Sequence, residues 1–391
     1  MKKQQIRYTL KHYLLGAISA RLGDEMTGQA ILLLGISLGS AALGSTLLAG
    51  LTFSAAIGGP LLGAVLDRSE RPGRTLALSL GLYAVGIGLI AWSIGHVPAT
   101  ISFALALLAG IFMPAISGGW SSRLKSFNPK EHMTRVSAID AATFNIVGLA
   151  GPALAGIIAG WLGASWAVAV IIALLVAALP MAWILPKHKI EFEKRTSFLQ
   201  DVLSGLKIIV TNRALFRVTL LSVISYMGIG MLWVICPLIG LTQTGSVGFG
   251  GIMMSVLSVG ALIATSLYAK WPTKYSADSV ALTTTIILAT ALLLLAFAGN
   301  VFVVLAAMFV AGLADGPQLA AVFSVRHREA PEQFRSQVFT TGASLKITAA
   351  AVGALVAGYL AEQSIVVSAV LAAGVQLLAA LSYILVRKAR H

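Results

Sequence analysis

Six ionisable side chains lie inside long apolar stretches of this 391-residue chain: Arg21, Asp24, Glu25, Asp140, Asp315 and Lys346. A charge at the centre of a bilayer costs at least about 2.5 kcal/mol unless it is compensated, so each is a candidate functional residue. In such a place a carboxylate can carry a proton or hold a cation, and a Lys or Arg can hold an anion.

The spacing of these residues predicts some of their partners. Arg21 precedes Asp24 by three residues and Glu25 by four, so it can reach one of them on a shared helix face. Glu25 lies a full turn after Arg21 and is its expected partner. Lys346 is either a partner for Asp315 or an anchor for a substrate anion. Desolvation favours the neutral form of a carboxylate. Asp24, the acid near Arg21 that is not its expected partner, is therefore the candidate proton carrier.

The remaining acid, Asp140, is expected near the mouth of its segment, where water can keep it ionised. A metal site has little support, because no His–carboxylate pair occurs in an apolar segment; only Asp24 with Cys236 stays open. No cofactor is expected.

Motifs typical of enzymes have little support in this chain. Residues 35–39 match the G-x-S-x-G hydrolase pattern, but they end an apolar segment, and no histidine lies in any such segment. No G-x-x-x-x-G-K-[ST] motif occurs, so ATP is not the expected energy source. We therefore expect no enzyme activity.

Helices that span a membrane must position these residues. The chain is 58% hydrophobic and 11% charged, against about 25% charged in soluble domains. Segments of about 20 apolar residues recur and predict an all-α membrane protein with twelve transmembrane helices. The expected spans are 13–36, 45–66, 75–94, 101–122, 136–160, 166–186, 218–241, 250–269, 279–298, 301–323, 337–360 and 365–386.

Charge in the linkers sets the orientation. All but two of the 28 Lys and Arg residues lie in alternate linkers and at the two ends: 1–12, 67–74, 123–135, 187–217, 270–278, 324–336 and 385–391. By the positive-inside rule these segments, and so both termini, are cytoplasmic. The net charge of +14 is thus explained by orientation, and no nucleic acid is expected.

The long linker predicts two pseudo-symmetric six-helix bundles, 1–186 and 218–391, joined by a cytoplasmic segment at 187–217. Its second half, 198–217, has helical spacing of apolar residues and predicts a helix in the membrane interface. A repeated six-helix unit is typical of transporters whose binding site lies between the repeats.

Three local patterns resemble the major facilitator superfamily. Residues 63–74, GAVLDRSERPGR, are similar to its signature loop, through Gly63, Asp67, Arg68, Gly73 and Arg74. Residues 148–156, GLAGPALAG, resemble its exporter motif, through Gly148, Gly151, Pro152 and Gly156. The Gly-Asp pair at 23–24 and residues 197–206, SFLQDVLSGL, resemble the enterobactin-exporter and macrolide-efflux branch.

The resemblance implies roles for these residues. Asp67 would bind the start of the eleventh span and latch one state. Pro152 would soften the fifth span, and Gly156 would extend a closely packed small face. Asp24, the mid-helix acid, would be the proton-coupling residue. Aromatic and Met side chains of the cavity helices would line a substrate pocket: Phe112, Trp120, Tyr226, Met231 and Trp233.

Two departures weaken the usual proton-relay scheme of the family. Residues 270–274 have lost the second signature loop, and the fourth span has no embedded arginine, since Arg123 comes only at its end.

The expected function is alternating-access export of small amphipathic or hydrophobic molecules, driven by protons or another coupling ion. The alternatives are a lysophospholipid or divalent-metal carrier of the same fold, and a non-transporting membrane sensor. The resemblance implies a monomer in the bacterial cytoplasmic (inner) membrane.

Overall fold

A computed structural model describes residues 9–38, 41–127, 133–187, 197–245, 249–271, 275–361 and 363–388. The chain forms two compact units. The first unit holds 1–131, 150–206 and 331–344, and the second holds 132–149, 207–330 and 345–391.

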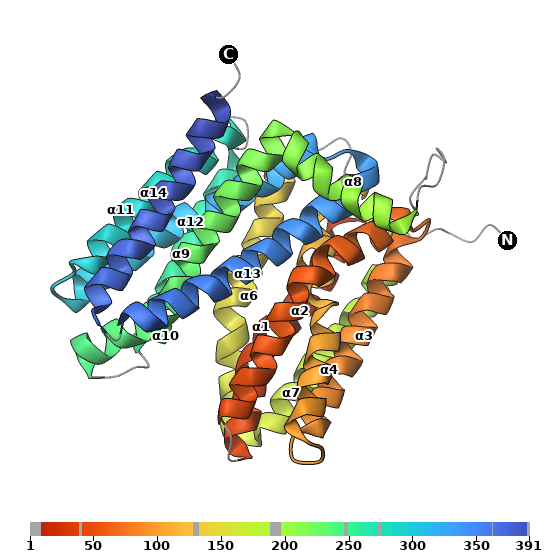
Figure 1. The fold of residues 1–391 in the computed structure, drawn as a ribbon, viewed down its shortest axis with the longest axis horizontal. Coiled ribbons are helices and arrows are strands. Elements are labelled where there is room, and N and C mark those ends of the chain that lie inside the picture. Colours follow the sequence, from red (N-terminus) through yellow and green to blue (C-terminus); the bar gives the residue numbers. More distant parts are fainter. Residues whose placement is uncertain are drawn as a thin grey trace. The chain divides into compact units, whose positions relative to one another are not determined.

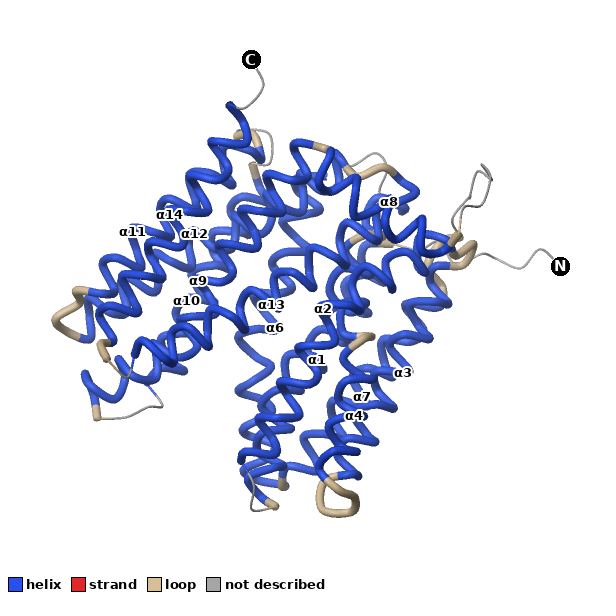
Figure 2. Tube along the Cα trace, in the orientation of Figure 1, coloured by secondary structure: helices blue, strands red, loops and turns tan. Residues whose placement is uncertain are grey.

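Helices account for nearly all described residues, and the tube in Figure 2 shows no strand among them. The first half of the chain contains α1 (Leu10–Ser37), α2 (Ala41–Arg68), α3 (Pro72–Ser93), α4 (Ala99–Gly110), α5 (Leu124–Phe127), α6 (Met133–Leu162) and α7 (Ala164–Trp183). The second half contains α8 (Phe198–Thr211), α9 (Arg213–Thr244), α10 (Phe249–Lys270), α11 (Ala277–Ala296), α12 (Val301–Glu329), α13 (Arg335–Ala361) and α14 (Ile365–Lys388).

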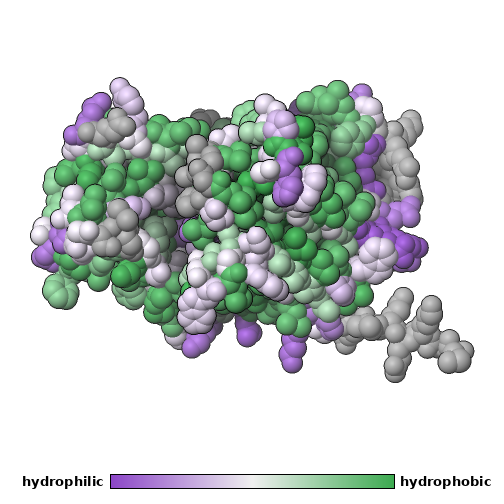
Figure 3. Space-filling view, turned by 90° about the horizontal axis from the view of Figure 1, so that it is seen from below, coloured by the Kyte–Doolittle hydropathy of each residue, from purple (hydrophilic) through white to green (hydrophobic). Residues whose placement is uncertain are grey.

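The membrane architecture predicted from the sequence is confirmed. Within the described residues, 11 helices are long and apolar enough to cross a membrane. The expected first span, α1, is not among these 11: it has 28 residues but carries Arg21, Asp24 and Glu25 in its middle. Large apolar side chains are exposed on these helices, such as Phe302 at 83%, and hydrophobic residues cover much of the surface in Figure 3.

In the first unit, α1 packs against α2 and α7, α3 packs against α7, and α2 packs against α4 (Figure 1). Glycines permit the contact of α2 with the fourth span, because a Cβ at Gly58 or Gly110 would overlap the partner backbone. The fourth span is not the single helix that we expected. It leaves α-helical geometry after Gly110 and continues as a π-helix at Ala115–Gly119, directly after Pro114.

In the second unit, α12 packs against α10 and α11, and α14 packs against α9 and α11 (Figure 1). Close approach again depends on glycine: a Cβ at Gly312 would overlap the backbone of Leu257. The core of this unit includes Met231, Leu232 and Cys236, all fully buried.

The compact units differ from the expected halves in two segments. Residues 133–149 of α6 belong to the second unit, where Thr134 bonds to Ser324 at 3.1 Å and Asn145 to Thr265 at 3.2 Å. The segment 331–344, which includes the start of α13, belongs to the first unit. Sequence order could not show this, because it follows from the long-range polar contacts of α6 and α13.

The connections follow from local chemistry. Gly163 has φ +102°, a backbone conformation that favours glycine, and it lets α7 begin directly after α6. The side chain of Asn212 accepts from the backbone N–H groups of Ala214 and Leu215 at 3.0 Å, which caps α9. The helix expected over 198–217 therefore ends at Thr211 as α8, and α9 begins at Arg213.

Cysteine labelling tests the predicted orientation. In a background with the buried Cys236 replaced by Ala, single cysteines are placed at Ser165 and Ser204, both of which are exposed. Because Ser204 lies in a basic linker and Ser165 does not, we expect an impermeant maleimide to label Ser165→Cys on intact cells and Ser204→Cys only after permeabilisation. Labelling of both from one side would contradict the twelve-span topology.

Candidate functional site

The buried guanidinium of Arg21 organises the middle of α1. Its Nη2 donates to the Tyr13 hydroxyl at 3.3 Å and to the Ser121 hydroxyl at 3.0 Å. Neither bond is to Glu25, the expected partner of Arg21, so that pairing stays a prediction. Helical side chains point towards the N-terminus, which is consistent with Arg21 reaching back to Tyr13.

The two acids of α1 have different environments. Asp24 is half-buried, and its Oδ1 accepts a hydrogen bond from the Tyr83 hydroxyl of α3 at 2.9 Å. Tyr83 is itself buried, with 1% of its surface exposed. Glu25 is exposed and lies beside Gly151 of α6, where an added Cβ would come within 2.6 Å of the Glu25 Cβ. Tyr83 was not among the predicted site residues; its available signal was that it is the only tyrosine in the third span.

The exporter motif is only partly packed. Gly151 packs closely against Glu25. A Cβ at Gly148 or Gly156, in contrast, would meet no atom within 4 Å among the described residues. The expected close packing at Gly156 is therefore absent in this structure. The helix also continues through Pro152.

We therefore expect Gly151→Leu to abolish transport, because its side chain would displace the segment of α1 that carries Glu25. Gly156→Leu is the matched control: the same substitution on the same helix enters open space and should leave most transport intact. Uptake by each variant, normalised to folded protein in the membrane, checks this. Equal loss in both variants would show that the two positions act through something other than this contact.

The charges of the second unit include a contact that the sequence did not predict. The Lys346 Nζ lies over the Tyr226 ring, 4.0 Å from its centroid, which is a cation–π contact. Lys346 and Asp315 also attract each other electrostatically, and both side chains are half-buried, so the two roles expected for Lys346 stay predictions. Asp140 is fully buried rather than near water, because its part of α6 packs inside the second unit.

The residues expected to line a pocket divide into two groups. Trp120 and Met231 are fully buried. Trp120 packs edge-on against Tyr13, with ring centroids 5.7 Å apart. Trp120 and Met231 are therefore core residues in this structure. Phe112 and Tyr226 are half-buried and Trp233 is 49% exposed. Tyr226 and Trp233 are seven residues apart on α9 and so share a face.

The signature loop caps the start of α13. The two carboxylate oxygens of Asp67 accept from the backbone N–H groups of Ser336 at 2.9 Å and Gln337 at 2.8 Å. Arg123 adds an ion pair to Asp67 at 3.4 Å and a hydrogen bond to the Ser336 hydroxyl. Burial lowers the pKa of Arg123, and the Asp67 carboxylate opposes that shift. A carboxylate at a helix N-terminus is favoured by the exposed N–H groups and the helix dipole.

Glycine allows this capping. A Cβ at Gly63 would overlap the Gln337 backbone, and one at Gly59 would come within 2.6 Å of the Thr340 carbonyl oxygen. Thr340 also donates to the Gly59 carbonyl at 2.6 Å.

Not all of the signature loop takes part in this contact. Arg68 pairs with Asp201 of α8 at 2.8 Å. Gly73 and Arg74 open α3 and contact the end of α7.

Long apolar helices with ionisable residues at mid-span define a multi-pass membrane transporter. The Major Facilitator Superfamily model matches residues 13–222 and 218–391, and the chain belongs to that family. This is a family of membrane transporters of small molecules rather than of enzymes.

Similarity to individual proteins supports this assignment. The chain is 26% identical over 387 residues to an uncharacterised MFS-type transporter, y4rN, of Sinorhizobium fredii, covering 94% of this chain and 92% of that protein. The human organic anion transporter MFSD10 is similar in structure, with a TM-score of 0.75, 17% identity and coverage of 98% and 100%. A bacterial homologue of the iron transporter ferroportin, in an outward-facing state, is similar in structure with a TM-score of 0.78 and 16% identity. The match covers 96% of this chain and 98% of that chain. These structural likenesses establish the fold.

Proposed function

We propose that the protein is an alternating-access secondary transporter that exports small amphipathic or hydrophobic molecules in exchange for protons. The observation that carries this proposal is the environment of Asp24. This residue lies in the middle of a membrane helix, is bonded to the Tyr83 hydroxyl, and has no ion-pair partner among the described residues. Arg21 donates hydrogen bonds to Tyr13 and Ser121. Without a neighbouring cation, the neutral form of Asp24 has the lower free energy whenever water is excluded.

This arrangement supports proton exchange in both directions. A neutral Asp24 can retain the hydrogen bond from Tyr83, because either oxygen of a carboxylic acid can still accept. An ionised Asp24 is stabilised when water or a cationic group of the substrate reaches it. Proton and substrate would then compete for one side chain, which is the requirement for exchange.

Aromatic and charged side chains of the second unit suit an amphipathic substrate. In the second unit the ring of Tyr226, with Lys346 over it, and Trp233 on the same face of α9 offer aromatic surface beside charge. Aromatic faces bind apolar and cationic groups with little demand on their exact shape. This supports a broad substrate range of the drug or siderophore type, as in the efflux branch that residues 197–206 resemble.

The remaining parts of the proposal follow from the sequence. The basic linkers support cytoplasmic termini in a bacterial inner membrane, and a monomer is sufficient because each chain supplies both compact units.

The proposal is tested by substrate-induced proton movement. The purified protein is reconstituted into vesicles that contain a pH-sensitive dye, and dyes, antibiotics, siderophores, lysolipids and divalent metals are added in turn. We expect amphipathic organic compounds to cause pH changes that empty vesicles do not show. A response confined to lysolipids or to divalent metals would instead select the corresponding carrier, and no response to any class would favour a sensor.

A further inference from the structure

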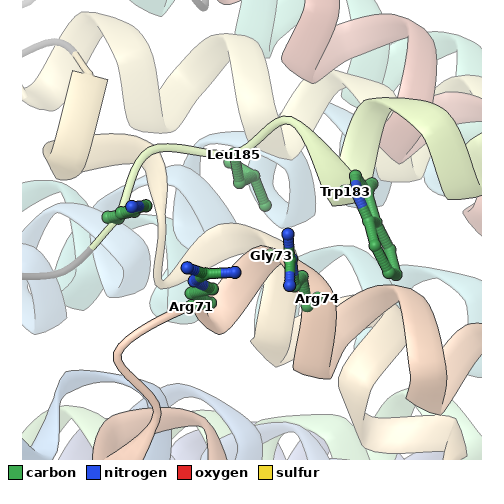
Figure 4. Close-up of a pocket in the computed structure, with 6 residues that line it drawn as sticks. Arg71, Gly73, Arg74, Trp183 and Leu185 are labelled. Atoms are coloured by element: carbon green, nitrogen blue, oxygen red, sulfur yellow. The ribbon is translucent and has the colours of Figure 1, made fainter.

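A basic pocket lies in the first unit at the end that carries the basic linkers. It is lined by Arg71, Gly73 and Arg74 at the start of α3, and by Trp183, Leu185 and Lys187 at the end of α7, and its volume is about 200 Å³ (Figure 4). The transport site proposed above uses none of these residues.

Among the residues that the structure describes, the positive charge of this pocket is not compensated. Three of its six lining residues are cations and none is acidic. In the described part of the chain, Arg71, Arg74 and Lys187 form no ion pair, and the Arg74 guanidinium lies 4.9 Å from the centroid of the Trp183 ring. The neighbouring acid, Glu70, is exposed and does not line the pocket. These charges suit an anion that can contact several cations at once, as a phosphate group does.

The pocket also lies at a helix N-terminus. α3 begins at Pro72, and no side chain caps it. The positive end of the α3 helix dipole lies beside the cations and favours an anion further, although Pro72 has no N–H and the Arg74 N–H donates to the Arg71 carbonyl. Gly73 is needed for this geometry, because a Cβ there would overlap the Ala182 carbonyl and approach the Leu185 Cβ to 2.7 Å.

An apolar surface continues from the pocket along the same two helices. On α3, Leu78 and Leu82 follow Arg74 at four-residue steps and are 63% and 41% exposed. On α7, Val176 precedes Trp183 by two turns and is 49% exposed. The helices α3 and α7 pack against each other, so these exposed apolar side chains lie on two neighbouring helices, and we refer to them as the strip.

We propose that this pocket binds the phosphate group of an anionic phospholipid, whose acyl chains lie along the strip on α3 and α7. Charge complementarity identifies the headgroup, and the exposed apolar side chains identify a lipid rather than a soluble phosphate. A tryptophan at this depth is typical of the membrane interface, and basic pockets between membrane helices on the cytoplasmic side are suited to anionic headgroups.

The test is lipid binding to the full-length purified protein. Intact-protein mass spectrometry counts adducts as phosphatidylglycerol or phosphatidylcholine is titrated into delipidated protein. We expect wild type to prefer phosphatidylglycerol and R71Q/R74Q/K187Q to lose at least tenfold in affinity for it, equivalent to about 1.4 kcal/mol. R71K/R74K keeps the charge and should bind within about twofold of wild type, a change of well under 1 kcal/mol.

The matched control is K11Q/R135Q/K270Q, which removes three exposed cations that do not line the pocket. It should bind phosphatidylglycerol like wild type. Protection of the buried Cys236 from thiol reagents verifies that each variant is folded. Equal weakening in both triple variants would mean a general charge effect and would overturn the site. Displacement of the lipid by an equal concentration of inorganic phosphate would show a free-phosphate site instead.

Discussion

Asp24→Asn should abolish accumulation of substrate against its gradient while leaving substrate-for-substrate exchange. Asn resembles a permanently protonated Asp in shape and charge, so it can still accept from the Tyr83 hydroxyl, which holds the native carboxylate at 2.9 Å. The substrate cycle could then continue, but no proton would be released. Uphill uptake and exchange of the same labelled substrate, both measured in proteoliposomes, give the two readouts.

Glu25→Gln is the matched control for this prediction. It removes a carboxylate from the adjacent position, but the Glu25 side chain is exposed and accepts no hydrogen bond in the described part of the chain. We expect uphill uptake to survive in this variant. If Asp24→Asn pumps with an unchanged pH profile, then Asp24 is structural, and Glu25 or Asp315 becomes the coupling candidate.

Asp67→Asn should lower transport at least tenfold with a folded protein. The carboxylate holds the Ser336 and Gln337 amides and the Arg123 guanidinium in a buried site. Hydrogen bonds to a charged group contribute about 1.5–3 kcal/mol each, and an amide side chain can replace only part of them. In the alternating access proposed above, α13 changes its packing, so a weaker cap should shift the balance between the two transport states by an order of magnitude or more.

Asp201→Asn is the control for the cap at α13. Asp201 pairs with Arg68 at 2.8 Å, but both side chains are partly exposed, and such a pair contributes only about 0–1 kcal/mol. Its transport should stay within about twofold of wild type, consistent with that small free energy. Initial transport rates, with the unfolding temperature followed by labelling of Cys236, separate function from folding. Equal rates in Asp67→Asn and wild type would remove the latch from the mechanism.

The membrane helices could be predicted from the sequence because the bilayer imposes one requirement on every span. Apolar length and the alternation of basic linkers therefore locate the helices without any knowledge of tertiary contacts. The exception is the fourth span, where Pro114 and the close glycine contacts produce a π-helical segment that hydropathy does not report.

The site was less predictable because its partners come from other helices. Spacing along α1 favoured Arg21 with Glu25, yet the guanidinium bonds to Ser121 from a distant segment. Asp140 was expected near water and is fully buried. The start of α13 belongs to the first compact unit, which no pattern within α13 reveals.

The measurement that tests the central claim most directly is uptake driven by a proton gradient alone. Proteoliposomes acidified inside, with no other ion gradient and no membrane potential, are given a labelled amphipathic substrate. One pH unit stores about 1.4 kcal/mol per proton, so one-for-one exchange of a neutral substrate predicts about tenfold accumulation, which a protonophore abolishes. Accumulation that is unchanged by the protonophore, or that follows an imposed Na⁺ gradient instead, would contradict proton coupling.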